Sequence, residues 1–139
     1  MRSAMKSAVL AVTLLVAACG GPLHYQLASS AKAPGADATL DADVSKDQHL
    51  THLKVGTKNL APPERVVPGT RIFIIWTRKN AEAQWSRAGN LKYDPASREG
   101  TFEGTVPEVD FDLQITTEKD DNAASPSADM IFSQHVGPA

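Results

Sequence analysis

Two pairs of aspartates stand two residues apart, a spacing that could offer carboxylate oxygens to calcium. Asp41 and Asp43 form one pair, and Asp110 and Asp112 form the other. On a β-strand, residues two apart project from the same face, so each pair would present its carboxylates together. Asp120-Asp121 could add ligands from a loop. Alternating aspartates are also typical of the solvated face of a half-buried strand. We favour this second interpretation and predict neither a metal nor another cofactor.

The four histidines do not have the spacing of a metal site. His49 and His52 lie three residues apart, so on a strand they would project from opposite faces. His24 and His135 lie near the two ends of the expected domain and could meet across adjacent strands. We interpret all four as solvated surface histidines.

The two tryptophans suggest one core residue and one surface residue. Trp76 ends an apolar run, and we expect it to pack between two sheets. Trp85 follows a polar loop and could lie partly exposed beside Tyr93, where an aromatic pair could stack on a sugar ring. Amphipathic packing at a strand end is the interpretation that we favour for this pair.

Motifs of the common hydrolases are missing from the sequence. It contains neither a Gly-x-Ser-x-Gly elbow nor a His-Glu-x-x-His helix, and its one thiol is Cys19. No serine has a histidine and a carboxylate in an evident arrangement with it. We therefore predict no enzymatic activity and no catalytic residues.

The N-terminus has the composition of an export signal. Arg2 and Lys6 are the only charged residues before Cys19, and small and apolar residues fill positions 8–18. This run is about half the ~20 apolar residues that a membrane-spanning helix needs, and it suits the core of a secretory signal. We predict that residues 1–18 are a helical signal peptide.

The signal ends at a cysteine with a characteristic context. The segment Leu15-Val16-Ala17-Ala18 before Cys19 resembles the lipobox of bacterial lipoproteins. The resemblance implies a diacylglycerol thioether on Cys19, cleavage after Ala18 and a lipid anchor in the membrane. Exported proteins use cysteines in pairs, and this single cysteine lies at the processing site. Gly20 follows the cysteine, which by the same resemblance implies the outer membrane. An ordinary signal peptide with a chance cysteine is the alternative.

Removal of residues 1–18 leaves 121 of the 139 residues, enough for one domain with a sizeable core. Two of the 14 basic residues lie in the signal, so the remainder carries 12 basic and 16 acidic residues. This balance argues against nucleic acid or anionic headgroups as the main partner.

Period-2 alternation predicts strands in most of the remaining chain. The predicted strands cover residues 24–27, 36–44, 52–56, 72–76, 110–117 and 130–136, with Met130, Phe132, Gln134 and Val136 on one face of the last. Proline and glycine mark the turns between them. We predict an all-β, immunoglobulin-like sandwich of seven or eight short strands over residues 24–139, with a closed barrel as the alternative. Residues 19–23 would be the lipidated cysteine and a short tether. A disordered tether over residues 20–36 is the competing interpretation.

The region from Leu27 to Val136 resembles the extracytoplasmic domain of anti-sigma-K factors. The residues that carry the resemblance are Leu27-Ala28, Ala33-Pro34-Gly35-Ala36, Asn59-Leu60, Ile72 to Trp76, Ala88-Gly89-Asn90-Leu91, Ile115-Thr116-Thr117-Glu118-Lys119 and Ser125-Pro126-Ser127. Such factors also have a sigma-binding helical domain and a transmembrane helix, for which this sequence has no counterpart. The resemblance therefore implies a fold without anti-sigma activity and without catalytic residues.

Together these patterns predict a lipid-anchored protein of the bacterial envelope, with its domain in the periplasm or at the surface. We expect a non-catalytic interaction module that engages an envelope protein or a cell-wall component. A lipoprotein that binds a ligand or an ion, either carbohydrate or calcium, is the alternative.

Overall fold

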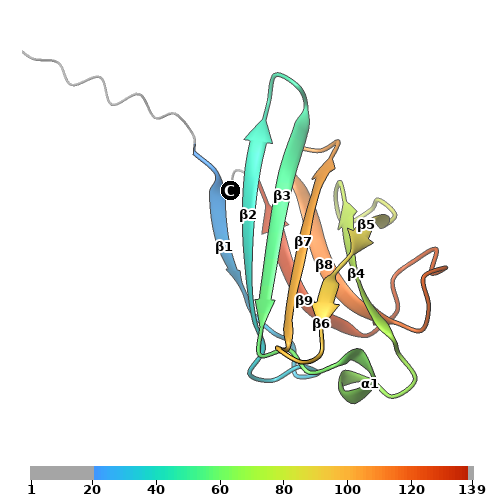
Figure 1. Ribbon diagram of the computed structural model, residues 1–139. Coiled ribbons are helices and arrows are strands. Elements are labelled where there is room, and N and C mark those ends of the chain that lie inside the picture. The colour runs from blue at the N-terminus through green and yellow to red at the C-terminus, as the bar shows by residue number, and fades with distance from the viewer. Residues whose placement is uncertain (1–20, 138–139) are drawn as a thin grey trace, which may run out of the picture.

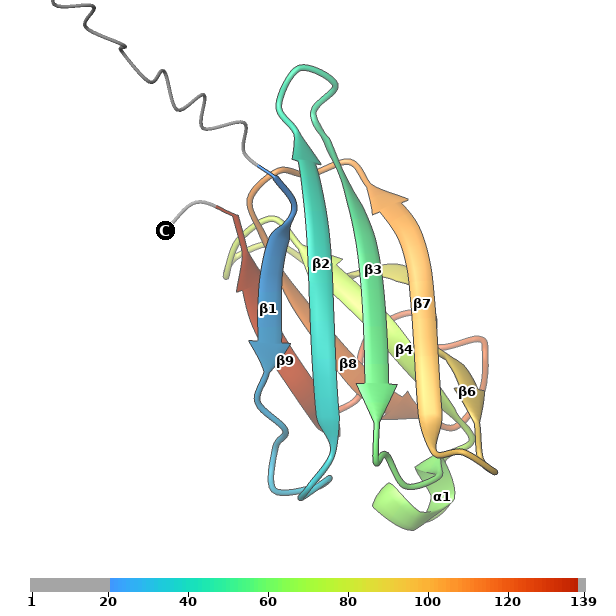
Figure 2. The same ribbon diagram turned by 60° about the vertical axis from the view of Figure 1, so that its left-hand side comes forward.

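Two antiparallel β-sheets pack face to face in the computed structural model, which describes residues 21–137 (Figure 1). One sheet has the strand order β1-β2-β3-β7-β6 and the other has the order β5-β4-β8-β9, as the turned view in Figure 2 shows. The elements are β1 (Leu23–Leu27), β2 (Asp37–Ser45), β3 (Leu50–Lys58), α1 (Pro63–Val66), β4 (Ile72–Arg78), β5 (Ser86–Asn90), β6 (Lys92–Asp94), β7 (Glu99–Val106), β8 (Phe111–Glu118) and β9 (Met130–Val136). The predicted all-β sandwich is confirmed, with nine strands in the described residues instead of seven or eight.

The strand order is that of an immunoglobulin sandwich with one strand added. If β2 is the first strand, A, the sheets read A-B-E-D and G-F-C-C′. β1 extends the first sheet at the outer edge of β2. Between the two sheets the described residues form one isolated bridge, Ser29 to Phe132, and no continuous ladder, so the structure is a sandwich and not a closed barrel.

The six strands predicted from alternation are present as β1, β2, β3, β4, β8 and β9. In β2 the pattern is clear, since Ala38, Leu40 and Ala42 are buried and Asp37 and Thr39 are exposed, although Asp41 and Val44 are both half-buried. The prediction missed β5, β6 and β7, which are short or rich in glycine.

Glycines in β5 and β7 make room for one aromatic ring between the sheets. A Cβ atom at Gly89 would lie 2.5 Å from the Phe102 ring, and one at Gly104 would lie 2.7 Å from it. The ring therefore occupies the space that side chains at both positions would fill. This explains why Gly104 stands where the alternation of β7 calls for an apolar residue, whereas at Gly100 a Cβ atom would lie 2.5 Å from Leu91.

The four-stranded sheet is buried on both faces at its centre. Phe73 and Ile75 of β4 belong to the core between the sheets, and the Phe73 ring meets Tyr93 of β6 edge-on with ring centroids 5.2 Å apart. Successive strand residues point to opposite faces, so Ile74 and Trp76 project from the outer face, where both are fully buried. The expected burial of Trp76 is confirmed, but its expected position between the sheets is wrong.

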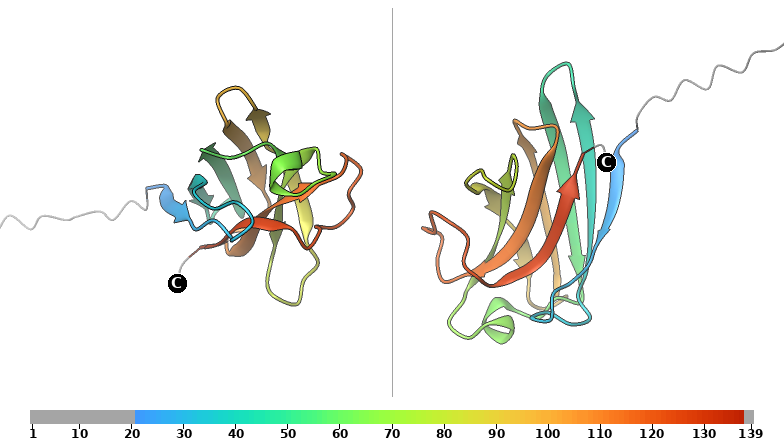
Figure 3. Two further views of the ribbon diagram at one scale, coloured as in Figure 1. Left: turned by 90° about the horizontal axis from the view of Figure 1, so that it is seen from below. Right: turned by 180° about the vertical axis from the view of Figure 1, so that it is seen from behind.

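A chain of hydrogen bonds runs along this outer face. The Trp76 indole donates to the Thr116 hydroxyl at 2.8 Å, and that hydroxyl donates to the buried Glu118 carboxylate at 2.5 Å. The backbone N–H of Ser127 donates to the same carboxylate at 2.9 Å, and its hydroxyl donates to the Thr117 carbonyl. Ser127 belongs to the loop of residues 119–129 between β8 and β9, seen in Figure 3. These bonds hold the base of that loop against the sheet.

Contacts from β1 and the loop that follows it to β9 and its flanking residues close one side of the sandwich. The backbone N–H of Gly137 donates to the Tyr25 hydroxyl at 3.2 Å, and the N–H of Ser30 donates to the Ile131 carbonyl at 2.7 Å. Lys32 and Asp129 form an ion pair at 3.0 Å. The competing interpretation of residues 20–36 as a disordered tether therefore does not hold for its described part, and β1 begins one residue before the predicted start of the domain. The predicted signal helix and Cys19 lie outside the described residues.

We expect Trp76→Ala to lower the free energy of unfolding by about 3–5 kcal/mol, because it empties a fully enclosed site. Trp76→Phe, which keeps a large ring and loses the indole N–H, should cost about 1–2 kcal/mol. Chemical denaturation of both variants measures the difference. A Trp76→Ala protein as stable as the parent would contradict the burial of this side chain.

We expect Gly104→Ala to destabilise the domain by about 1–3 kcal/mol. The added methyl group would collide with the Phe102 ring, which also lies against Gly89 and has little room to move aside. Gly21→Ala is the control, since its Cβ atom would have no neighbour within 4 Å. In a Phe102→Leu background the cost of Gly104→Ala should fall below about 0.5 kcal/mol. An equal loss of stability in both backgrounds would show that contact with the Phe102 ring is not the reason why Gly104→Ala destabilises the domain.

Candidate functional site: a polar groove on the four-stranded sheet

A groove of about 650 Å³ crosses the outer face of the four-stranded sheet. Most of its lining is polar, and its residues are Arg78, Trp85, Asp112, Leu113, Gln114, Met130, Ser133, Gln134 and His135. A second hollow, of about 710 Å³, lies on the five-stranded sheet around Gly56. We take the groove as the candidate site because it contains a tryptophan and a connected set of charged side chains.

Strand pairing places the groove residues in rows. Arg78, Asp112 and His135 form one row across β4, β8 and β9. In the next row, Gln114 lies between Trp76 of β4 and Ser133 of β9. Cross-strand neighbours on one face are in contact range, so each row acts as one surface.

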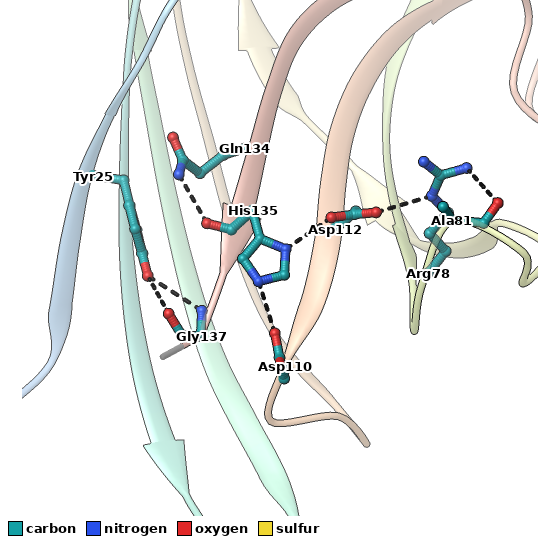
Figure 4. A network of polar contacts seen from close by, with 8 residues as sticks. All are labelled: Tyr25, Arg78, Ala81, Asp110, Asp112, Gln134, His135 and Gly137. Carbon is teal, nitrogen blue, oxygen red and sulfur yellow. Dashed lines mark hydrogen bonds and ion pairs between the residues drawn. The ribbon is translucent and has the colours of Figure 1, made fainter. Parts of the chain in front are cut away.

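The first row is a continuous polar network. The two ring nitrogens of His135 lie 2.8 Å from Asp112 and 2.7 Å from Asp110, so the imidazole bridges two carboxylates (Figure 4). The Arg78 guanidinium donates to the other oxygen of Asp112 at 3.1 Å and lies 4.4 Å from the centroid of the Trp85 ring. The network therefore fixes the tryptophan at one side of the groove.

The same contacts shift the ionisation of two groups. The hydrogen bond to Asp112 raises the pKa of His135 above its ordinary value of 6.5, and the nearby Asp110 carboxylate adds to the effect. The hydrogen bond from His135 lowers the pKa of Asp112 below its ordinary value of 3.8, and Arg78 acts in the same direction. Both shifts favour the charged pair.

Four of the six aspartates considered as possible calcium ligands have cationic or amide partners. Asp110 and Asp112 share His135, and Asp41 lies 2.5 Å from His24. Asp121 accepts hydrogen bonds from Arg87 and Asn90, beyond the end of β8 farthest from Asp110. Within residues 21–137, no three His, Cys, Asp or Glu side chains are grouped to hold a metal.

The histidines lie apart from one another. His49 is exposed in the turn between β2 and β3, whereas His52 contacts Glu103 at 3.0 Å and Thr105 at 3.2 Å. His24 and His135, which the sequence could bring together, each pair with a different aspartate. The prediction of surface histidines is confirmed, and their acidic partners on adjacent elements were missed.

Trp85 and Tyr93 do not lie beside each other, as the sequence would have allowed. Tyr93 packs on Phe73 in the core and donates its hydroxyl to the Leu60 carbonyl at 2.5 Å. Its pKa is raised by burial. Trp85 lies on the opposite side of the four-stranded sheet, against Arg78.

Two groove residues were missed for different reasons. Ile131 is an extra residue at a bulge in β9, so Met130 pairs with Thr116 while Phe132 pairs with Ile115. The bulge turns Met130 to the outer face, and its expected place beside Phe132 is wrong. Gln114 had a usable signal, because a long polar side chain in an interior strand needs a partner or an opening.

No protein-family model, curated protein or solved structure matches the chain. The resemblance to the outer domain of anti-sigma-K factors therefore stays a prediction from the residues that carry it. Within the described part of the chain, no helix is long and apolar enough to cross a membrane.

We expect the His135 network to stabilise the domain most between pH 3.8 and 6.5, the ordinary pKa values of its two shifted groups. The contribution of His135 is complete below its unfolded pKa and is lost as pH rises through its raised folded pKa. The contribution of Asp112 is lost as pH falls through its lowered folded pKa. Because the His135 side chain is 52% exposed, the effect should stay below about 1 kcal/mol.

Denaturation of the parent and His135→Gln proteins from pH 5 to pH 9 measures this contribution. The stability difference should shrink as pH rises. His49→Gln, at an exposed turn, is the control for histidine loss. A difference between parent and His135→Gln that does not change with pH would contradict the network.

Proposed function

We propose that the protein is a bacterial envelope lipoprotein, anchored by lipids on Cys19, whose sandwich is a non-catalytic interaction module. The observation that carries this proposal is the position of β1. It begins at Leu23 and pairs with β2 along its whole length, so only residues 20–22 separate the lipobox cysteine from the folded domain. Three residues reach at most about 11 Å, which would hold the domain close to the headgroups.

This placement defines which parts of the sandwich a partner could reach. β1 starts at the end of the sandwich that carries the β2–β3 hairpin, and α1 lies at the opposite end (Figure 2). The groove opens on the outer face of the four-stranded sheet, which runs between these two ends. We propose this face as the contact surface for an envelope protein or a cell-wall component. By resemblance of the segment around Gly20, the membrane is the outer membrane.

We expect Cys19→Ala to abolish lipid attachment and to leave the signal peptide uncleaved at this site. The measurement is mass spectrometry of the N-terminus, with detergent partitioning of the full chain expressed in a diderm bacterium. Two or more acyl chains give stable attachment, so the parent should partition into detergent and the variant should lose its acyl mass. Gly21→Ala is the control. It lies two residues after Cys19 and its Cβ atom would have no neighbour within 4 Å, so this variant should behave as the parent does. An unmodified Cys19 in the parent would refute the proposal.

A further inference from the structure

Gln114 is the groove residue whose chemistry the fold leaves unused. Its residue is only 8% exposed, yet its carboxamide makes no hydrogen bond within residues 21–137. Among the described residues, the buried side-chain oxygens that lack a partner belong to Glu108 and Thr117, so the amide of Gln114 is in contact with solvent at the groove. Since Gln114 lines the groove, the missing partners have to come from the groove side, either from water or from a ligand.

The neighbours of Gln114 give the groove a definite chemical character. Ser133, beside it on β9, adds a hydroxyl that can donate and accept. The carboxamide itself offers two donors and one acceptor oxygen. Trp85 and Met130 contribute the large apolar surfaces of the lining. A ligand that fits must carry both hydrogen-bond donors and acceptors. It must also have an apolar face that can pack on an indole ring.

The charged residues of the groove select against an ionic ligand. Arg78 is paired with Asp112, and His135 is paired with both Asp112 and Asp110. An ionic ligand would have to displace one of these partners. The mostly polar lining is equally unsuited to an apolar ligand, because sites for such ligands are predominantly hydrophobic.

We propose that this groove binds an oligosaccharide, with sugar hydroxyls on Gln114 and Ser133 and a pyranose ring packed on Trp85. Sugar hydroxyls donate and accept, and the C–H face of a pyranose ring is apolar, so the ligand matches both features of the groove. Arg78 is a positioning residue, since it holds Trp85 in place and is itself held by Asp112. The inference rests on the proposed function only in taking the ligand from the cell envelope.

The test uses the full chain in detergent micelles, probed on an array of bacterial cell-wall and surface oligosaccharides that includes tetra-N-acetylglucosamine. Each bound glycan is then titrated by isothermal titration calorimetry, which does not depend on the Trp85 indole as a reporter. Trp85→Ala and Gln114→Leu should each weaken binding at least tenfold. Gln114→Leu should leave the melting temperature unchanged or higher, because the amide that it removes has no partner in the fold. Thr101→Ala, on the hollow of the five-stranded sheet, is the matched control and should bind as the parent does.

Three outcomes would overturn the inference: no glycan on the array binds, binding is unchanged in both groove variants, or the groove instead captures peptides from a random-peptide array. The same titration with the Cys19→Ala chain separates the two proposals. Glycan binding should persist in that variant, whereas the N-terminal mass reports on the anchor alone.

Discussion

The hydrogen-bonded chain from the Trp76 indole through Thr116 to Glu118 is the constraint on which the four-stranded sheet depends. Alternation in β4 sends Phe73 and Ile75 inward, so a large indole has to be buried on the side that faces away from the other sheet. The loop after β8 is tied to Glu118 by Ser127, which helps to cover that side. The result is a sheet with apolar packing on both faces at one end and an open polar groove at the other.

Without a disulfide in the described domain, the sheets are held by packing and by contacts at their margins. The Phe102 ring fits between Gly89 of β5 and Gly104 of β7. A side chain at either glycine would collide with the ring. On the opposite side, Ser30 and Tyr25 bond to β9 and its end. These contacts join the margins of the two sheets, where a sandwich is otherwise open to water.

The sequence allowed the sandwich to be predicted wherever side chains alternate clearly, as in β2. It could not reveal β7 in the same way, because Gly100 and Gly104 replace apolar residues there. Gly104 leaves room for the Phe102 ring of the same strand, whereas Gly100 leaves room for Leu91, which lies outside β7. Which face of the sheet Trp76 occupies could not be predicted either. The residues of β4 are apolar on both faces, so the sequence has no alternation that would separate the inward from the outward positions. A single bulge at Ile131 likewise moved Met130 into the groove. Of the candidate site, Trp85, Asp112 and His135 were identified as residues of interest, but their arrangement with Arg78 required the strand order.

The position of β1 has a mechanical consequence. In a chain anchored at Cys19, any force that pulls the domain away from the membrane enters at Leu23 and acts along the axis of β1. Five residue pairs, from Leu23–Ala42 to Leu27–Ala38, join β1 to β2 in antiparallel register. Load along the strand axis shears all of these pairs at once, whereas load across it would open them one after another. The edge strand that looks like an addition to the immunoglobulin sandwich would therefore serve as its force-bearing connection to the membrane.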